Sequence, residues 1–173
     1  SSKTKIGFPE VTFGILPTAG GLIRLTRLIG LEAALPFLLE GKQVTPNVAK
    51  EVSIIDDLAD DIKEVFSKAK QYILANPEKL QPWDTKDYKM PGGNANHHKN
   101  TQMLAIAPAI LRKKTNGNYP APEAILSAAV ESSLVDFDTA SKIESRYFVE
   151  LVTDKVAKNM INAFWFQLNK IKS

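Results

Sequence analysis

The sequence lacks cysteine, contains only two histidines, and has no apolar run long enough to cross a bilayer. Without cysteine, disulfide frameworks, thiolate metal sites and cysteine nucleophiles are excluded. The net charge of +3 comes without a long basic run, so we expect neither nucleic-acid binding nor a membrane span. The first residues do not resemble a signal peptide, which predicts a cytoplasmic protein. What is present is a globular composition, with 44% hydrophobic residues in a chain of 173.

Hydrophobic periodicity predicts a mainly helical chain with a few short strands near its start. Two prolines and two glycines interrupt the apolar stretch 6–17, which predicts extended segments and turns. A brief strand is expected at Ile54 and Ile55, and an irregular connection at 78–99. Helices are expected over about 21–29, 31–40 (with Pro36 inside it), 62–75, 101–114, 122–133 and 138–152, with further helices starting after Thr45 and Asp154.

Four aspartates precede the helix expected at 62–75. Carboxylates suit the positive end of a helix dipole. A calcium loop would also need a central glycine and a terminal glutamate, which this stretch lacks. We therefore expect these aspartates, Asp56, Asp57, Asp60 and Asp61, to cap the helix, and we expect no metal site. Within the helix, one face is apolar and is formed by Ile62, Val65, Phe66, Ala69, Tyr72 and Ile73.

Glu10 is the first candidate for chemistry. It is a single carboxylate among apolar neighbours, of which Phe8 and Val11 are examples. A carboxyl group kept from water can serve as a general acid or base near neutral pH. The alternative is an outward-facing glutamate on an edge segment.

The glycine-containing stretch 14–21 is the second candidate. Glycines before a helix let the backbone approach a ligand and point free N–H groups at it. The stretch matches neither the dinucleotide fingerprint nor the P-loop, because the glycine spacing differs and no lysine follows. The alternative is tight packing against a neighbouring element.

These residues together resemble the crotonase (enoyl-CoA hydratase/isomerase) superfamily. The resemblance is carried by Gly7-Phe8-Pro9-Glu10-Val11, Gly14-Ile15-Leu16-Pro17, Ala19-Gly20-Gly21, Arg24-Leu25, Arg27-Leu28-Ile29-Gly30, Gly41-Lys42 and Ile54-Ile55-Asp56. More narrowly, Tyr119-Pro120-Ala121-Pro122 and residues 144–166 look like the hydratase part of multifunctional fatty-acid β-oxidation proteins. In such proteins a linker helix leads on to a 3-hydroxyacyl-CoA dehydrogenase domain.

The resemblance implies the C-terminal half of a crotonase-like α/β spiral fold with linker helices. Residues 1–60 would form the C-terminal part of the crotonase-like core, and 61–118 would be helices and an irregular connection. Residues 119–173 would cover the acyl site and supply the linker helix toward the dehydrogenase domain.

The resemblance also implies an activity, the hydration of 2-trans-enoyl-CoA thioesters. Glu10 falls on the family's catalytic glutamate and would deliver or remove the proton at C2. Pro17 and Thr18 fall on substrate-pocket positions. Thr18 replaces a glycine whose N–H helps to hold the attacking water in the family, which keeps a backbone N–H but reduces the room around it.

The family's other catalytic groups belong to a preceding half of the fold. That half carries a first glutamate, two oxyanion N–H groups and most of the CoA site, so the chain by itself is expected to be inactive. We expect no cofactor in this chain, because NAD would belong to the dehydrogenase domain.

The expected partners are an acyl-CoA substrate, that preceding half, the dehydrogenase domain, a thiolase subunit and further copies of the chain. Two alternatives stay open: complementation by a separate preceding half, and a non-catalytic helical piece that self-associates. Self-association would follow if the apolar faces around 6–16 were uncovered.

Overall fold

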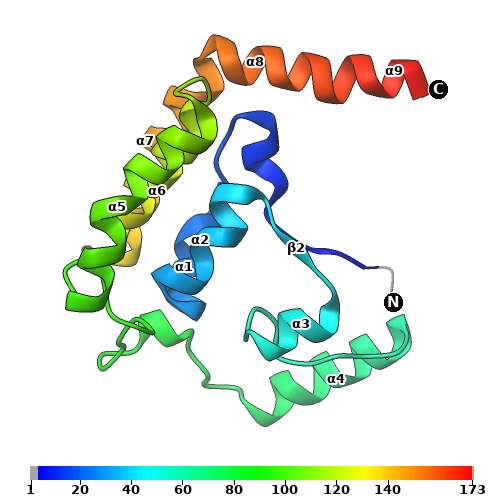
Figure 1. Cartoon of the computed structure of the whole chain (residues 1–173). Helices are drawn as coiled ribbons and strands as arrows, with labels where there is room; N and C mark the ends of the chain where they lie inside the picture. Colours follow the sequence, from blue (N-terminus) through cyan, green and yellow to red (C-terminus); the bar gives the residue numbers. More distant parts are fainter. Residues whose placement is uncertain (1–3, 173) are drawn as a thin grey trace.

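The computed structural model describes residues 4–172, and this range is mainly helical, as predicted (Figure 1). The elements in chain order are β1 (Ile6–Gly7), η1 (Pro9–Phe13), α1 (Gly21–Ile29), α2 (Leu31–Glu40), β2 (Gln43–Val44), α3 (Pro46–Glu51), α4 (Ile62–Ala75), η2 (Pro82–Asp84), α5 (His98–Thr115), α6 (Pro120–Ser132), α7 (Phe137–Thr153), α8 (Lys155–Ile161), η3 (Asn162–Gln167) and α9 (Leu168–Lys172).

The two strands near the start of the chain form a minimal antiparallel pair, with Ile6 opposite Val44. The sequence predicted extended segments and turns after β1. The structure instead forms the 3₁₀ helix η1 there. Proline suits its first turn, since its fixed φ matches a helix and the missing N–H would have no partner there. Gly14 ends η1 in the left-handed conformation (φ 76°) and donates its N–H to the Val11 carbonyl at 3.0 Å.

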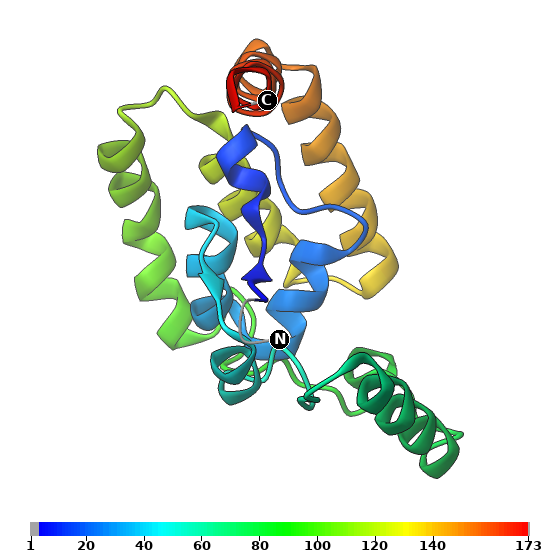
Figure 2. The same ribbon diagram turned by 90° about the vertical axis from the view of Figure 1, so that its right-hand side faces the viewer.

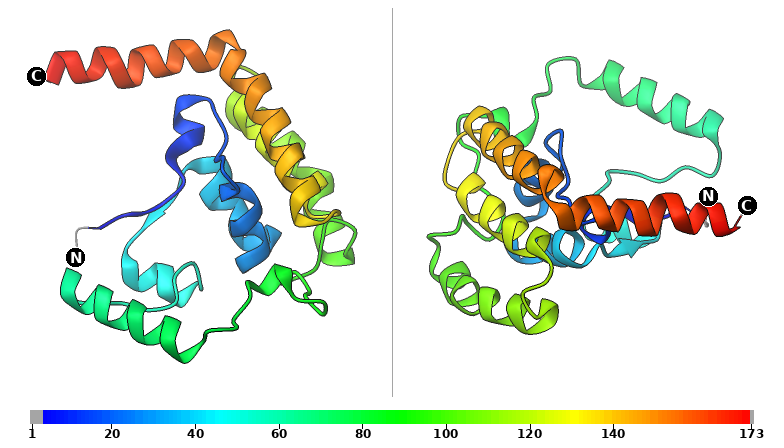
Figure 3. Two further views of the ribbon diagram at one scale, coloured as in Figure 1. Left: turned by 180° about the vertical axis from the view of Figure 1, so that it is seen from behind. Right: turned by 90° about the horizontal axis from the view of Figure 1, so that it is seen from above.

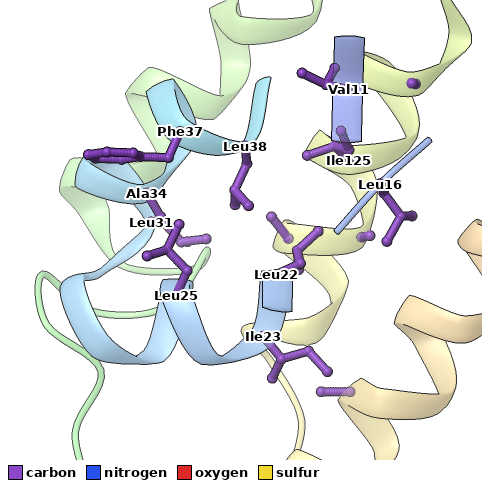
Figure 4. Packing of buried hydrophobic residues seen from close by; sticks show 14 of the residues in the cluster. Val11, Leu16, Leu22, Ile23, Leu25, Leu31, Ala34, Phe37, Leu38 and Ile125 are labelled. Atoms are coloured by element: carbon purple, nitrogen blue, oxygen red, sulfur yellow. The ribbon is translucent and has the colours of Figure 1, made fainter. Parts of the chain in front are cut away.

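The main core lies where η1, α1 and α2 pack against α6 and α7 (Figures 1 and 4). Leu22 and Ile23 of α1, Leu38 of α2 and Ile125 of α6 are completely buried. Figure 4 shows their side chains converging between the helices. Pro36 lies inside α2, which begins at Leu31 without a late start.

A smaller cluster joins α5 to α2 and α6 through Leu35, Leu111 and Leu126. At the C-terminal side, α8 continues through the π-helical segment η3 into α9 (Figure 1). The first part of this rod packs on η1, where the Trp165 ring meets the Phe13 ring edge-on at 5.9 Å. Its far end extends beyond the body, and Ile171 is 81% exposed.

Helix α4 stands apart from the core, as Figure 2 and the right-hand view of Figure 3 show. None of its residues is buried, and Phe66 on its apolar face is 71% exposed. The expected uncovered face at 6–16 is therefore wrong. Val11 and Leu16 from that stretch lie in the core, and many of the exposed apolar side chains belong to α4 and the α8–α9 rod instead.

The brief strand expected at Ile54 and Ile55 is also wrong. Both residues lie in a turn after α3, and both donate their N–H groups to the Ala49 carbonyl, at 2.8 and 3.4 Å. β-branched residues fit strands, but a backbone that caps a helix end in this way has no N–H left for a ladder.

Candidate functional site

Glu10 is the second residue of η1 and is partly buried. Its Oε2 atom is buried and has no hydrogen-bond partner within residues 4–172. A buried carboxyl oxygen without a partner is costly, unless the group is protonated or a ligand completes it. One carboxyl oxygen of Glu10 is thus shielded from water, and Glu10 forms none of the ion pairs found among residues 4–172.

Local hydrogen bonds hold the backbone of η1 around Glu10. The Glu10 carbonyl accepts a hydrogen bond from the Ile15 N–H at 3.3 Å, and the Thr12 hydroxyl donates to the Pro9 carbonyl at 2.6 Å. Helix α8 packs on the same element, so Gly14 lies directly against Ala157 and Met160. A side chain at position 14 would meet the Ala157 backbone at 3.0 Å, which explains the need for glycine.

Pro17 and Thr18 lie in the turn between η1 and α1. Pro17 is completely buried and packs beside Phe8 and Gly21, and Thr18 is partly buried. The Thr18 carbonyl accepts from the Gly21 N–H at 3.0 Å. Phe8 is the residue before η1, and its ring lies against Gly21, as Pro17 does. The start of η1 thus contacts this turn. The three predicted site residues therefore lie on η1 and on the turn that follows it.

The N–H groups at the start of α1 are not open to a ligand, contrary to the ligand-binding interpretation of stretch 14–21. Glu144 of α7 reaches this helix end, and its Oε1 accepts from the Gly20 N–H at 2.7 Å. Glu144 is only 2% exposed, and burial raises the pKa of its carboxyl, opposed by the backbone N–H groups of α1. Packing, the alternative interpretation, is what the structure supports.

Sequence reasoning did not single out Glu144. The only available signal was an acidic residue on a helix with many apolar neighbours, and this pattern does not say which helix end it will reach. Its Oε2 atom, like that of Glu10, is buried without a hydrogen-bond partner in the described part of the chain.

A hollow of about 600 Å³ lies elsewhere, between the end of α1 and the connection before α5. Arg27, Trp83, Tyr88 and Phe137 line it, and none of the predicted site residues does. The buried Arg27 guanidinium donates to the carbonyls of Ser132 and Val135 at 3.2 and 2.8 Å. These bonds tie α1 to the α6–α7 turn, which accounts for Arg27 as a packing residue.

A smaller hollow of about 240 Å³ lies beside η1 itself. Val11 and Gly14 line it from η1 and its end, Val156 and Met160 line it from α8, and the other lining residues come mainly from the α5–α6 turn. Its walls are mostly apolar, so it suits a hydrocarbon chain better than a polar group.

Within residues 4–172 no group of three or more metal-ligating side chains lies close enough to hold a metal ion. In the same range, no helix is both long enough and apolar enough to traverse a bilayer.

Comparison with known proteins finds relatives named as fatty acid oxidation complex alpha subunits. The chain is 33% identical over 163 residues to the fatty acid oxidation complex subunit alpha of Vibrio parahaemolyticus, covering 94% of this chain and 23% of that protein. It is 35% identical over 157 residues to the protein of the same name from Shewanella amazonensis, covering 88% of this chain and 21% of that protein. No family model matches the chain. The chain is thus similar to less than a quarter of the length of fatty acid oxidation complex alpha subunits.

Proposed function

We propose that this chain supplies the Glu10 side of an enoyl-CoA hydratase/isomerase site that serves fatty-acid β-oxidation. The observation that carries the proposal is the buried Oε2 of Glu10, which has no hydrogen-bond partner among residues 4–172 and belongs to a residue with apolar neighbours in the sequence. The similarity to fatty acid oxidation complex alpha subunits supports the lipid substrate class.

In this proposal Glu10 handles the proton at C2 of the acyl group. Hydration breaks the C2–C3 π bond and forms one bond from C3 to the water oxygen and one from C2 to a proton. A carboxyl group that lacks an internal partner is free to exchange that proton with the substrate. For isomerisation, the same group would remove a proton from the acyl chain and return it at another carbon.

Thr18 would help to place the attacking water through its backbone N–H. Pro17, which is completely buried and lies against Gly21, would keep the turn in position. The hollow between η1 and α8 would take the hydrocarbon part of the substrate, because apolar side chains line it next to the helix that carries Glu10.

The reaction needs more groups than η1 and the turn after it offer. Enolate character at the thioester oxygen calls for two N–H donors, and the water needs a second base. The family resemblance assigns these groups to the preceding half of the fold. The proposal therefore expects no turnover from the 173-residue chain alone, and turnover when that half is added.

The test is a crotonyl-CoA hydration assay that follows loss of the conjugated thioester absorbance. The chain is assayed alone and mixed with the portion of the Vibrio parahaemolyticus relative that precedes the matched region. In an active mixture, Glu10→Gln should lower kcat by about 10²- to 10⁴-fold. Glu51→Gln, at an exposed glutamate of α3, is the matched control and should leave kcat unchanged. Turnover that survives Glu10→Gln undiminished would refute the proposed role.

A second candidate function is self-association without catalysis. It is favoured by the exposed apolar side chains of α4 and the α8–α9 rod, including Phe66 and Ile171. Light scattering decides between the two: a defined oligomer that has no hydration activity, even after the preceding half is added, supports the second candidate.

A further inference from the structure

We infer that Glu144 and Arg24 are positioning residues that clamp a single peptide unit, the one between Ala19 and Gly20, next to the proposed site. This inference rests on the proposed function for its catalytic consequence, but the clamp itself can be tested without any activity.

The two bonds grip opposite ends of the same amide plane. The Arg24 Nη1 atom donates to the Ala19 carbonyl at 2.5 Å, and the Gly20 N–H donates to Glu144 Oε1 at 2.7 Å. A carbonyl and the N–H that follows it belong to one rigid peptide unit. A cation therefore holds the oxygen end, and a carboxyl group holds the hydrogen end.

The Arg24 bond is charge-assisted, and the Glu144 bond is charge-assisted when that carboxyl is ionised; such bonds are stronger than neutral hydrogen bonds. They come from different places, since Arg24 lies on α1, one turn after the clamped peptide, and Glu144 lies on α7, far along the chain. Burial of Glu144 reduces the screening of its bond by water. The clamp thus links the start of α1 to α7.

The clamped peptide adopts a conformation that needs such support. Ala19 has φ of +55° and Gly20 has φ of +79°, so two successive residues lie in the left-handed region. For alanine this costs about 1–2 kcal/mol. A flip of the peptide plane changes ψ of Ala19 and φ of Gly20, and glycine accepts the new φ without penalty. The hydrogen bonds to Arg24 and Glu144 therefore favour one of the two orientations of this peptide plane.

The orientation matters because Thr18 is the next residue back. The Thr18 carbonyl bonds to the Gly21 N–H, so the turn 18–21 closes over the clamped peptide. Loss of the two bonds would let this central peptide turn over and would loosen the turn that begins at Thr18, whose backbone N–H the proposed function uses to place water. Glu144 and Arg24 therefore act on the reaction through Thr18 and do not touch the substrate.

The sequence offers a selective probe, because Ala19-Gly20 is the only alanine–glycine pair among its nine glycines. A chain labelled with ¹³C at alanine carbonyls and ¹⁵N at glycine gives one NMR correlation, which arises from the clamped peptide. Amide hydrogen exchange of this peptide is measured in the wild type and in Glu144→Gln, Arg24→Gln and the double variant. The control is Glu150→Gln, at an exposed glutamate on the same helix as Glu144.

We expect each single variant to speed exchange of the Gly20 amide about tenfold or more. The increase in exchange rate in the double variant should be smaller than the combined effects of the two single variants, because both residues hold the same peptide unit. The control should match the wild type. Since Arg24 is exposed, Arg24→Gln keeps the test valid even if Glu144→Gln unfolds the chain. Unchanged exchange in Arg24→Gln, or strictly additive effects in the double variant, would overturn the clamp.

In the activity assay with the preceding half, Glu144→Gln should lower kcat and leave KM for crotonyl-CoA nearly unchanged. A rise in KM as large as the fall in kcat would refute the positioning role. If exchange responds as expected but the mixture never hydrates crotonyl-CoA, the clamp stands and the proposed function fails.

Discussion

Helices α2 and α4 show what a hydrophobic pattern does and does not determine. Both form where the sequence predicts them, yet α2 buries five residues and α4 buries none. α2 is apolar on several sides, and η1, α1 and α6 surround it. α4 carries a single apolar stripe that no described element covers. Periodicity thus specifies a helix, whereas burial depends on which other elements are present.

Helix α4 is instead stabilised by its own first turn. The Asp61 side chain accepts from the Glu64 N–H at 2.8 Å, and the Glu64 carboxylate accepts from the Asp60 N–H at 2.7 Å. Lys68, one turn later, pairs with Glu64 at 2.9 Å. Each of these exposed caps and i,i+4 pairs stabilises the helix far less than a packed core would.

The largest contrast is expected from one substitution made in both helices. Leu38→Ala removes a completely buried side chain of α2 and should lower the free energy of unfolding by about 3 kcal/mol. Leu74→Ala on α4, where the leucine is 70% exposed, should change it by less than about 0.5 kcal/mol. Urea denaturation measures both. Equal losses would mean that α4 packs on the core in solution.

A smaller contrast is expected from two aspartate caps with the same geometry. Asp136 caps α7 and Asp61 caps α4, and each accepts from a backbone N–H at 2.8 Å. Asp136→Ala should lower the free energy of global unfolding and the urea midpoint, because α7 is part of the core. Asp61→Ala should speed hydrogen exchange within α4 alone and leave the global urea midpoint unchanged. A shift of that midpoint in Asp61→Ala would contradict the independence of α4.

The smallest effect is expected in the pH dependence of stability. Burial raises the pKa of Glu144, so between the ordinary glutamate pKa of about 4.3 and the native value the folded chain holds a proton that the unfolded chain has lost. The contribution of Glu144 to the free energy of unfolding therefore falls as pH rises through that window. Glu144→Gln should flatten this slope, and Glu150→Gln should not. Urea denaturation of the three proteins at several pH values measures it; identical slopes would argue against a buried Glu144 carboxyl.

Much of the helical layout could be predicted because its signals are local. Gly30 and Gly41 end α1 and α2 where expected, and Thr45, Asp61 and Asp154 stand at the starts of α3, α4 and α8. Caps act within one turn, so the sequence nearby is sufficient to locate them.

What could not be predicted depends on contacts between distant segments. The partner of Gly20 is Glu144, which lies 124 residues away, and no spacing rule connects them. The uncovered face of α4 depends on which surfaces meet, which periodicity does not report. For the candidate site, the sequence neighbours of Glu10 indicated an apolar setting. Only the structure shows that one carboxyl oxygen of Glu10 is buried and that Pro17 packs in the turn after η1.

The π-helical segment in the C-terminal rod has a consequence for the direction of its side chains. An α-helix turns about 100° per residue, so a wider π turn shifts the side chains after it relative to those before it. Ala157 and Met160 precede Asn162–Gln167 and face η1, whereas Leu168 and Ile171 follow it. The side chains after the π segment are therefore rotated about the helix axis relative to the register that Ala157 and Met160 set, although the helix itself is continuous.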